Sequence, residues 1–256
     1  MKSVTFFPGS REPAAVIRCA AMLRTIWAVI VTIVVTIPLA TTVLIIAMLS
    51  SASPWIDPVI RLWARLILWG AGIEIRGEGI EKIDRGKRYI LIANHHSYFD
   101  IPCIFAAIPQ PIRFMAKKSL FSIPIFGWAI GRAGFIPIDR KNRRTAVKSF
   151  DLAVERIRKG NTIVIFPEEG RSRELAMRPF QRGAFLLAIR SELPILPLAI
   201  DGTWEVFRVG AKRITPGVVT IRVGTEIETA GTSVRAKDTL LEQSRGQIES
   251  MLVPRA

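Results

Sequence analysis

The two histidines of this chain are adjacent and stand close to a carboxylate in the sequence. His95 and His96 are the only histidines among 256 residues, and Asp100 follows His95 by five positions. The imidazole side chain titrates near neutral pH, which makes histidine the usual general base. An aspartate at this spacing can orient and polarise such a base. The pattern therefore predicts base chemistry at this place in the chain.

The residues before the histidines predict a strand that holds them. The apolar run 89–93 ends directly before Asn94, and such a run is typical of a buried strand. Polar residues between a strand and the following helix occupy the usual place of a site in an α/β fold. The alternative interpretation is structural, because Ser97 and Asp100 have the spacing of a helix N-cap and its acidic partner. On that interpretation Asp100 only caps the helix and the histidines are solvated.

Four segments of the chain form an ordered set. Residues 94–100 have the form Asn-His-x-Ser-x-x-Asp, and three more segments follow: Gly-Phe-Ile-Pro-Ile-Asp-Arg at 134–140, Phe-Pro-Glu-Glu-Gly-Arg-Ser at 166–172 and Leu-Pro-Ile-Leu-Pro-Leu at 193–198. In order and spacing this set resembles the four sequence blocks of the glycerolipid acyltransferase family, of the lysophosphatidate acyltransferase type. Phe-Met-Ala-Lys at 114–117 also matches. The resemblance covers residues 70–225.

The resemblance implies catalytic roles for the first block. His95 would be the general base, with Asp100 as its partner, when an acceptor hydroxyl attacks an acyl thioester directly. A covalent route through Ser97 is the alternative, but the resemblance implies that Ser97 is structural. His96 occupies a position that varies in the family and is expected to be a bystander.

The resemblance also implies which residues bind the acceptor. Lys117 and Arg171 would contact its phosphate, for which the planar fork of an arginine is well suited. Glu168 would position the glycerol part. Asp139 and Arg140 would shape the acceptor pocket, or alternatively form an ion pair with each other. The predicted supporting residues are Asn94, Ser97, Gly170, Ser172 and Pro197, the last on a rigid strand that lines the acyl path or forms a core edge.

The third block departs from the family pattern, which is usually Phe-Pro-Glu-Gly-Thr-Arg-Ser. This chain has Glu169 and Gly170 where the family commonly has Gly and Thr. An additional carboxylate disfavours a phosphate nearby unless it points away. A lyso-lipid with a less anionic head, such as a lyso-ornithine lipid, is therefore an alternative acceptor.

The N-terminal region is typical of a membrane-bound segment. Half of the residues are hydrophobic and the formal charge is +15. No charged residue occurs from Thr25 to Ile56, which exceeds the ~20 apolar residues that span a bilayer. Pro38 is expected to kink this segment. A second apolar segment, Val59–Ile73, contains two arginines and three nearby tryptophans, a pattern typical of an interfacial helix.

Basic residues flank the long apolar segment on both sides, which favours a cytoplasmic location for both flanks. We therefore predict a helical hairpin that enters the membrane and returns. The alternatives are a complete span followed by a surface helix, a cleaved signal peptide and a buried core helix. The predicted localisation is the membrane, with the active site facing the cytoplasm (the inner membrane in a bacterium).

Composition limits the other chemistry. Two cysteines, Cys19 and Cys103, give neither a disulfide framework nor metal-ligand spacing, and we expect no cofactor and no metal. The basic charge accompanies no recognised nucleic-acid module, so attraction to anionic lipid headgroups is the simpler explanation. The expected partners are a lysophospholipid acceptor, a donor thioester on acyl carrier protein or coenzyme A, and an anionic membrane surface, but no nucleic acid.

Strand and helix patterns alternate after the hairpin. We predict an α/β fold with a mixed central sheet flanked by helices, preceded by an N-terminal membrane-associated helical hairpin. Residues 1–71 would form the tail and hairpin, and residues 72–256 the acyltransferase domain. The predicted strands are 74–76, 89–93, 113–116, 135–138, 162–166, 195–200 and 218–223. The predicted helices of the domain are 98–107, 125–132, 144–159, 181–191 and 237–251.

The resemblance, together with the apolar N-terminal region, implies a membrane-bound enzyme that moves a fatty acyl chain from acyl carrier protein or coenzyme A to the free hydroxyl of 1-acylglycerol 3-phosphate. The alternatives are an acyltransferase for another lyso-lipid and a lipid-binding homologue without activity. The pairing of His95 with Asp100 argues against the last of these.

Overall fold

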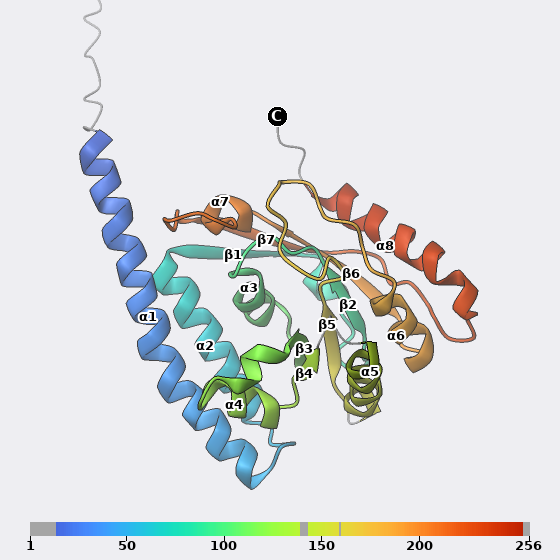
Figure 1. The fold of residues 1–256 in the computed structure, drawn as a ribbon. Helices are drawn as coiled ribbons and strands as arrows, with labels where there is room; N and C mark the ends of the chain where they lie inside the picture. Colours follow the sequence, from blue (N-terminus) through green and yellow to red (C-terminus); the bar gives the residue numbers. More distant parts are fainter. Residues whose placement is uncertain (1–13, 139–142, 159, 253–256) are drawn as a thin grey trace, which may run out of the picture.

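A single mixed sheet organises the chain. The computed structural model describes residues 14–138, 143–158 and 160–252, and within them the strands follow the order β1-β7-β6-β2-β5-β3-β4 (Figure 1). β6 runs antiparallel to β7, and the other neighbours are parallel. The strands are β1 (Ile73–Glu78), β2 (Ile90–Ala93), β3 (Ile112–Lys117), β4 (Ile136–Ile138), β5 (Thr162–Ile165), β6 (Ile195–Asp201) and β7 (Gly217–Val223).

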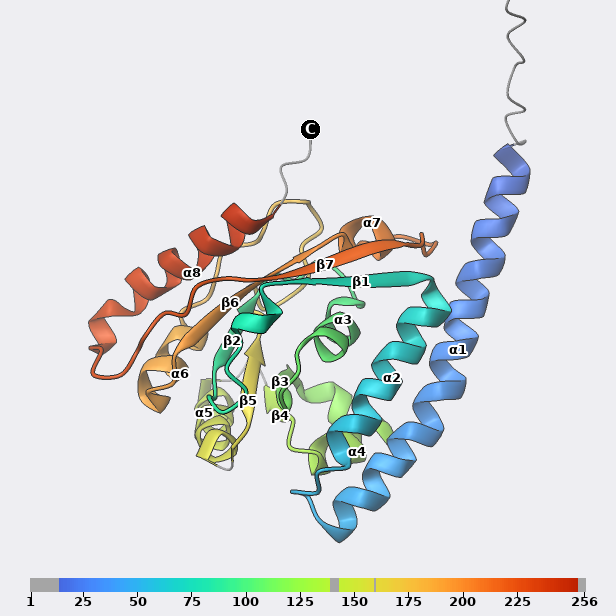
Figure 2. The same ribbon diagram turned by 180° about the vertical axis from the view of Figure 1, so that it is seen from behind.

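Helices cover both faces of the sheet, and each face has its own hydrophobic core. In β2, Leu91 and Ala93 face one core, whereas Ile90 and Ile92 face the other. We call the first side the hairpin face; it is covered by α1 (Ala14–Leu49), α2 (Ile56–Ala71), α3 (Asp100–Ala107) and α4 (Phe126–Arg132). We call the second side the closed face; it is covered by α5 (Arg143–Arg158), α6 (Gly183–Ser191) and α8 (Lys237–Met251). Figure 2 shows the two helical layers from behind.

The helices α1 and α2 form a closely packed antiparallel pair (Figure 1). A Cβ added at Gly70 of α2 would lie 2.7 Å from a methyl group of Val31, so only glycine allows this approach. Trp63 Nε1 donates a hydrogen bond to Thr36 Oγ1 at 3.0 Å. α1 continues without interruption through Pro38. The predicted helical pair is therefore present, while the predicted kink at Pro38 stays a prediction.

The short helix α2 is joined to the domain by charged side chains as well as by its apolar face. The guanidinium of Arg113 in β3 donates to both carboxylate oxygens of Asp57, at 2.6 and 3.2 Å. Arg61 donates to the main-chain oxygens of Ile108 and Gln110 after α3. The hairpin-face core is thus continuous across residues 71 and 72, and a domain boundary at that point stays a prediction.

Helix α1 exposes most of its apolar surface. Its segment Ala21–Leu49 is the one helix, within the described residues, that is long and apolar enough to cross a membrane, and only 17% of the residues in an apolar 18-residue stretch of it are buried inside the protein. The whole helix of 36 residues spans ~54 Å at 1.5 Å per residue. Such a surface indicates association with a membrane.

All seven predicted strands and all five predicted helices of the domain are present. The prediction of an α/β fold with a mixed central sheet is confirmed. Sequence reasoning missed the helix α7 (Thr203–Phe207) and the three single-turn helices η1 (Ile80–Lys82), η2 (Lys118–Ser122) and η3 (Val234–Ala236). Helix α3 begins at Asp100, two residues later than predicted, because the loop before it makes other hydrogen bonds.

Candidate active site

The predicted site residues follow the carboxyl ends of parallel strands. Asn94 and His95 follow β2, Glu168 follows β5 and Lys117 ends β3. Because these three strands are neighbours and run in the same direction, their carboxyl ends lie along one edge of the sheet. Asp139 and Arg140 follow β4, but they lie outside the described residues, and nothing about their structure enters the site.

His95 and Asp100 form a hydrogen-bonded pair. His95 Nδ1 lies 2.7 Å from Asp100 Oδ2, and the imidazole is only 14% exposed, whereas the carboxylate is fully buried. An ionised carboxylate can only accept, so in this pair Nδ1 would be the donor, and in a neutral imidazole Nε2 would then keep a lone pair. The imidazole is also stacked on Phe166, with the ring centroids 4.0 Å apart. The pair thus has the arrangement of an oriented general base.

Asp100 also organises the loop in which it stands. Its Oδ2 accepts hydrogen bonds from the main-chain N–H groups of His96 and Ser97, each at 2.8 Å. The bond to Ser97 is one half of the capping pattern, but the Ser97 hydroxyl accepts from Phe99 N instead of from Asp100 N. The catalytic and structural interpretations are therefore compatible, because one oxygen atom serves both the imidazole and the loop.

The third block holds the main chain of His95 on both sides. The N–H of His95 donates to Glu168 Oε1 at 2.7 Å, and its carbonyl oxygen accepts from Ser172 N at 2.9 Å. The other oxygen of Glu168 accepts from Arg178 N at 2.8 Å. Both oxygens of Glu168 are thus engaged by the main chain. This geometry favours a role in positioning His95 over the predicted direct contact with glycerol.

The environment of Glu168 changes its acidity. Burial raises the pKa of this carboxyl to about 7, and the hydrogen bonds from the N–H groups of Arg178 and His95 only partly oppose that rise. The side chain is 2% exposed. A buried carboxyl between two N–H donors is therefore close to its titration point at neutral pH.

The supporting residues of the first block connect it to β6 and α7. The amide of Asn94 both donates to Ile200 O (2.9 Å) and accepts from Ile200 N (2.7 Å), which extends the β2–β6 pairing. The Ser97 hydroxyl donates to Phe207 O at 2.8 Å. Because this hydroxyl is buried and bonded to the main chain, the geometry favours a structural Ser97 over a nucleophile.

His96 is buried next to the site rather than solvated. Its Nδ1 lies 3.2 Å from the amide nitrogen of Asn94, and its ring meets Trp204 edge to face with the centroids 5.9 Å apart. These contacts are those of a packed side chain. They agree with the expectation that His96 is a bystander, which stays a prediction.

Two basic side chains lie at this edge of the sheet. The guanidinium of Arg171 stacks on the ring of Tyr98, 3.3 Å from its centroid. Lys117 is exposed at the end of β3. The structure thus brings Arg171 next to the first block, through a contact that sequence reasoning did not predict.

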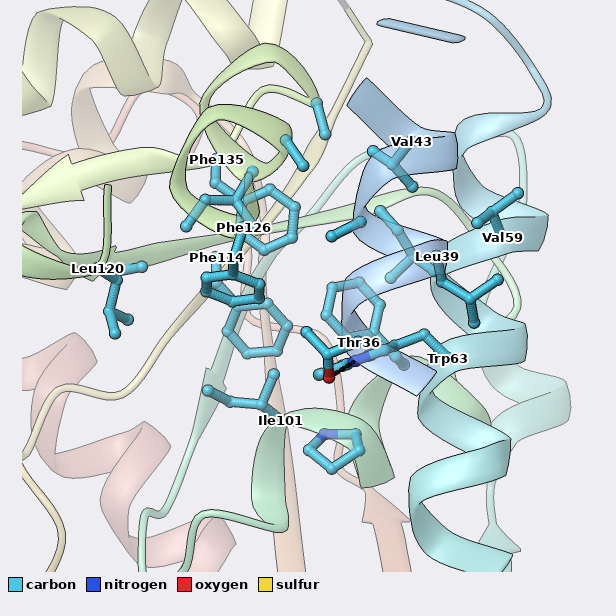
Figure 3. Close-up of a pocket in the computed structure, with 18 of the residues that line it drawn as sticks. Thr36, Leu39, Val43, Val59, Trp63, Ile101, Phe114, Leu120, Phe126 and Phe135 are labelled. Carbon is cyan, nitrogen blue, oxygen red and sulfur yellow. Dashed lines mark hydrogen bonds between the residues drawn. The ribbon is translucent and has the colours of Figure 1, made fainter. Parts of the chain in front are cut away.

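An apolar cavity of about 150 Å³ opens beside the site on the hairpin face (Figure 3). Its walls come from α1, α2, α3, β3, η2 and α4, with Phe135 from the loop before β4, and Figure 3 shows side chains from these parts of the chain pointing into a common space. Phe114 lines the cavity and is stacked on Phe166, the ring that lies against His95. Along this path two aromatic side chains, Phe166 and Phe114, lie between the imidazole and the cavity.

Several predicted features are placed relative to this cavity. Leu120 of η2 and Phe126 of the predicted helix 125–132 line the wall. Pro197 is buried in β6 and is not among the lining residues; its carbonyl accepts from Gly224 N. The fourth block is therefore part of the sheet core in this structure and not a wall of the cavity. Within the described residues no group of three or more metal-ligating side chains is found.

Comparison with known proteins agrees with the sequence blocks. The family model described as Acyltransferase matches residues 74–201, which is half of the chain. The chain belongs to this acyltransferase family. The prediction of that family from its sequence blocks is confirmed.

Relatives of the acyltransferase carry consistent names. A chloroplastic 1-acyl-sn-glycerol-3-phosphate acyltransferase of Brassica napus is 28% identical over 157 residues, 61% of this chain and 45% of the relative. The proteins of that enzyme name from Limnanthes douglasii and Saccharomyces cerevisiae are 35% and 36% identical, over 61% and 52% of this chain and 56% and 44% of theirs. The chain thus spans about half the length of these relatives.

A solved structure shares the fold of the acyltransferase. The 1-acyl-sn-glycerophosphate (LPA) acyltransferase PlsC from Thermotoga maritima superposes with a TM-score of 0.76, covering 93% of this chain and 99% of that one. The sequences are 23% identical. The similarity extends over the N-terminal helices as well as the sheet.

The structure gives a physical reason for the family's usual glycine in the third block. Glu169, at that position, has a φ of 53°, in the left-handed region that glycine adopts at least cost. The side chain is exposed. At the next position, a Cβ added to Gly170 would lie 2.8 Å from Nη1 of Arg178. A threonine at position 170, which the family commonly has, would therefore place its side chain against Arg178 in this acyltransferase.

Three contacts at the site were missed by sequence reasoning. They are the stack of Phe166 on His95, the stack of Arg171 on Tyr98, and the N–H of Arg178 on Glu168. Tyr98 stands inside the first block and Phe166 inside the third, so their aromatic character was a usable signal. Nothing in the sequence indicates that the main chain of Arg178 returns to Glu168.

Proposed function

We propose that this acyltransferase moves a fatty acyl chain from acyl carrier protein or coenzyme A to the free hydroxyl of 1-acylglycerol 3-phosphate, giving phosphatidate. The observation that carries the proposal is the oriented His95–Asp100 pair next to an apolar cavity. The names of the relatives support the same reaction.

The reaction needs one proton acceptor. As the acceptor's hydroxyl oxygen attacks the thioester carbonyl carbon, Nε2 of His95 takes the hydroxyl proton and a C–O bond forms. Asp100 stabilises the resulting imidazolium. The C–S bond then breaks, and the departing thiolate receives the proton from His95. The products are the ester and the free thiol of the donor.

The cavity supports a long-chain substrate. Its lining is almost entirely apolar, with Thr36 and Tyr98 as the residues that carry a hydroxyl. Burying a methylene group contributes ~0.8 kcal/mol, so an acyl chain inserted beside Phe114 gains binding energy and has its carboxyl end held near the imidazole. Arg171 and Lys117 would then bind the acceptor's phosphate at the same edge of the sheet.

The membrane would supply the lysophospholipid acceptor. The exposed apolar surface of α1 supports insertion of the helical pair, with α2 too short to span a bilayer and joined to the domain. Both ends of the chain would be cytoplasmic. Reporter tags at the two termini test this arrangement, and an N-terminal tag found alone on the outer side would establish a complete span instead.

A direct assay tests the proposed reaction. The purified full chain is supplied with an acyl thioester and an equal mixture of lysophosphatidate and lyso-ornithine lipid, and the products are measured by mass spectrometry. Phosphatidate from the wild type but not from the His95→Ala variant is the expected result. Exclusive use of lyso-ornithine lipid would assign the extra carboxylate Glu169 to a cationic head, and binding without any product would identify a lipid-binding homologue.

A further inference from the structure

Tyr98 is an exposed aromatic residue inside the first block. The residue is 63% exposed, although the residues on either side of it are buried. Exposure of a single large ring needs no explanation by itself. Here, however, the ring lies between two parts of the site that the proposed reaction must use together.

One part is the guanidinium of Arg171. Its central carbon lies 3.3 Å from the centroid of the Tyr98 ring, so the two groups are stacked. The five N–H donors of a guanidinium lie in its plane. Stacking on an aromatic ring occupies one face of the group and leaves the N–H edge free. The contact thus fixes the direction of the guanidinium without using the donors that a phosphate requires.

The other part is the apolar cavity. Tyr98 is one of its lining residues, and of the first-block residues 94–100 it is the one that reaches the cavity. The main chain beneath the ring is fixed, because the Ser97 hydroxyl bonds Phe207 and the Tyr98 ring itself packs near the ring of Phe207. Tyr98 is therefore held in place from below while one face carries Arg171.

We propose that Tyr98 is a positioning residue that pre-organises Arg171 for an anionic phosphate and separates that phosphate from the acyl cavity. The inference rests on the proposed function for the identity of the acceptor. It assigns to the aromatic ring, and not to its hydroxyl, the task of holding the guanidinium. The phosphate then stays at the polar side of Tyr98, while the acyl chain lies on the apolar side.

Steady-state kinetics of Tyr98→Leu and Tyr98→Phe test the inference. Leucine keeps an apolar lining for the cavity but removes the aromatic face. A cation–π contact of ~0.5–2 kcal/mol predicts a rise of about 2- to 30-fold in the acceptor KM, with kcat at saturating acceptor and the donor KM little changed. Phenylalanine keeps the face and should restore an acceptor KM close to that of the wild type.

A double-mutant cycle with Arg171→Ala gives the decisive comparison. If Tyr98 acts through the guanidinium, then Tyr98→Leu has no further effect on the acceptor KM once Arg171 is alanine. Phe126→Leu is the matched control, because Phe126 lines the same cavity from α4, whereas Arg171 is stacked on Tyr98. This control should show additivity with Arg171→Ala. Additivity for Tyr98→Leu, or an effect on the donor KM alone, would overturn the inference.

A binding measurement separates this inference from the proposed reaction. The affinity of detergent-solubilised protein for lysophosphatidate is measured in the His95→Ala background, with and without Tyr98→Leu. Weaker binding through the Leu change supports the inference even if the wild type forms no phosphatidate. Turnover of lysophosphatidate with unchanged binding would retain the reaction and reject the role of Tyr98.

Discussion

The two faces of the sheet differ in how completely they are closed. On the closed face, neither α6 nor α8 has a large apolar side chain among the exposed ones, and its buried core includes Phe185 and Ile248 at 0% exposure. On the hairpin face, α1 exposes a continuous apolar surface and the core contains a cavity. The same strands thus support one face that is packed for stability and another that leaves apolar surface available for lipid.

The largest expected effect concerns His95, the proposed base, which follows β2 at the edge of the sheet. His95→Ala should lower turnover by about 10²- to 10⁴-fold, the usual effect of losing a general base, while the protein stays folded and membrane-bound. His96→Ala is the neighbouring control and should retain most of the activity. Turnover measured at saturating substrate checks this prediction, and the opposite ranking of the two variants would exchange their roles.

The substitution Asp100→Asn should also lower turnover strongly. An effect confined to the melting temperature would show that Asp100 only caps the helix.

The comparison of the two faces is sharpened by one substitution on each. Ile248→Ala creates a void in the closed core and should lower the free energy of unfolding by ~2–5 kcal/mol, without a change in acyl-chain preference. Val43→Phe narrows the open cavity (Figure 3). If the added ring excludes two methylene groups of a bound acyl chain from the cavity, the binding free energy falls by ~1.6 kcal/mol. The ratio of turnover with shorter donors to turnover with longer donors should therefore rise about tenfold.

Denaturation curves and donor chain-length profiles check these two variants. Equal loss of stability with no change in chain preference would show that the hairpin face is an ordinary core.

A third prediction concerns the pH dependence of stability through Glu168. Its pKa in the folded protein is about 7, above the ordinary 4.5, so between these values the native carboxyl keeps a proton that the unfolded chain has released. The free energy of unfolding should therefore fall by about 3 kcal/mol, in order of magnitude, as the pH rises through this window. Glu168→Gln removes this slope. The free energy of unfolding is measured at pH 5 and pH 8 for the wild type and for Glu168→Gln. An equal change with pH in the two proteins would contradict the prediction.

The smallest expected effect concerns the strained glutamate of the third block. Glu169→Gly relieves a left-handed backbone at the cost of a more flexible unfolded chain, and should stabilise the protein by ~0.5–1 kcal/mol. It should also leave the acceptor KM for lysophosphatidate unchanged or lower it. Glu192→Gly is the matched control, since Glu192 has a φ of 54° at the end of α6.

The control should give the same gain in stability without any change in the acceptor KM. Loss of activity in Glu169→Gly alone would indicate a cationic acceptor.

The local features of this fold were predictable from the sequence. Apolar runs such as 89–93 and 195–200 defined the strands, because buried parallel strands are almost entirely apolar. Helix α7 was missed, since its five residues are too few to show a helical period. The start of α3 was placed too early because the Ser97 hydroxyl bonds Phe99 and Phe207 in place of a helix N–H.

The long-range features of the site were not predictable. The segment Val59–Ile73 was predicted to be an interfacial helix, which stays a prediction; that α2 also has seven buried residues and joins Arg113 through Asp57 was not predicted. Its two arginines gave the polar signal, but Arg61 is directed to carbonyls after α3. Periodicity shows which side of a helix is apolar and does not show whether lipid or protein covers it. The stack of Arg171 on Tyr98 has the same origin, because 73 residues separate its members.

The bonds that hold His95 have a consequence for biosynthesis. Its N–H and C=O are satisfied by Glu168 and Ser172, which leave the ribosome 73 and 77 residues after it. At ~5–20 residues per second, the nascent chain carries its imidazole for about 4 to 15 s before those partners exist. Helix α1 is made earlier still. The proposed base can therefore take its oriented position only after the third block has been synthesised, whereas the apolar surface of α1 is present well before that.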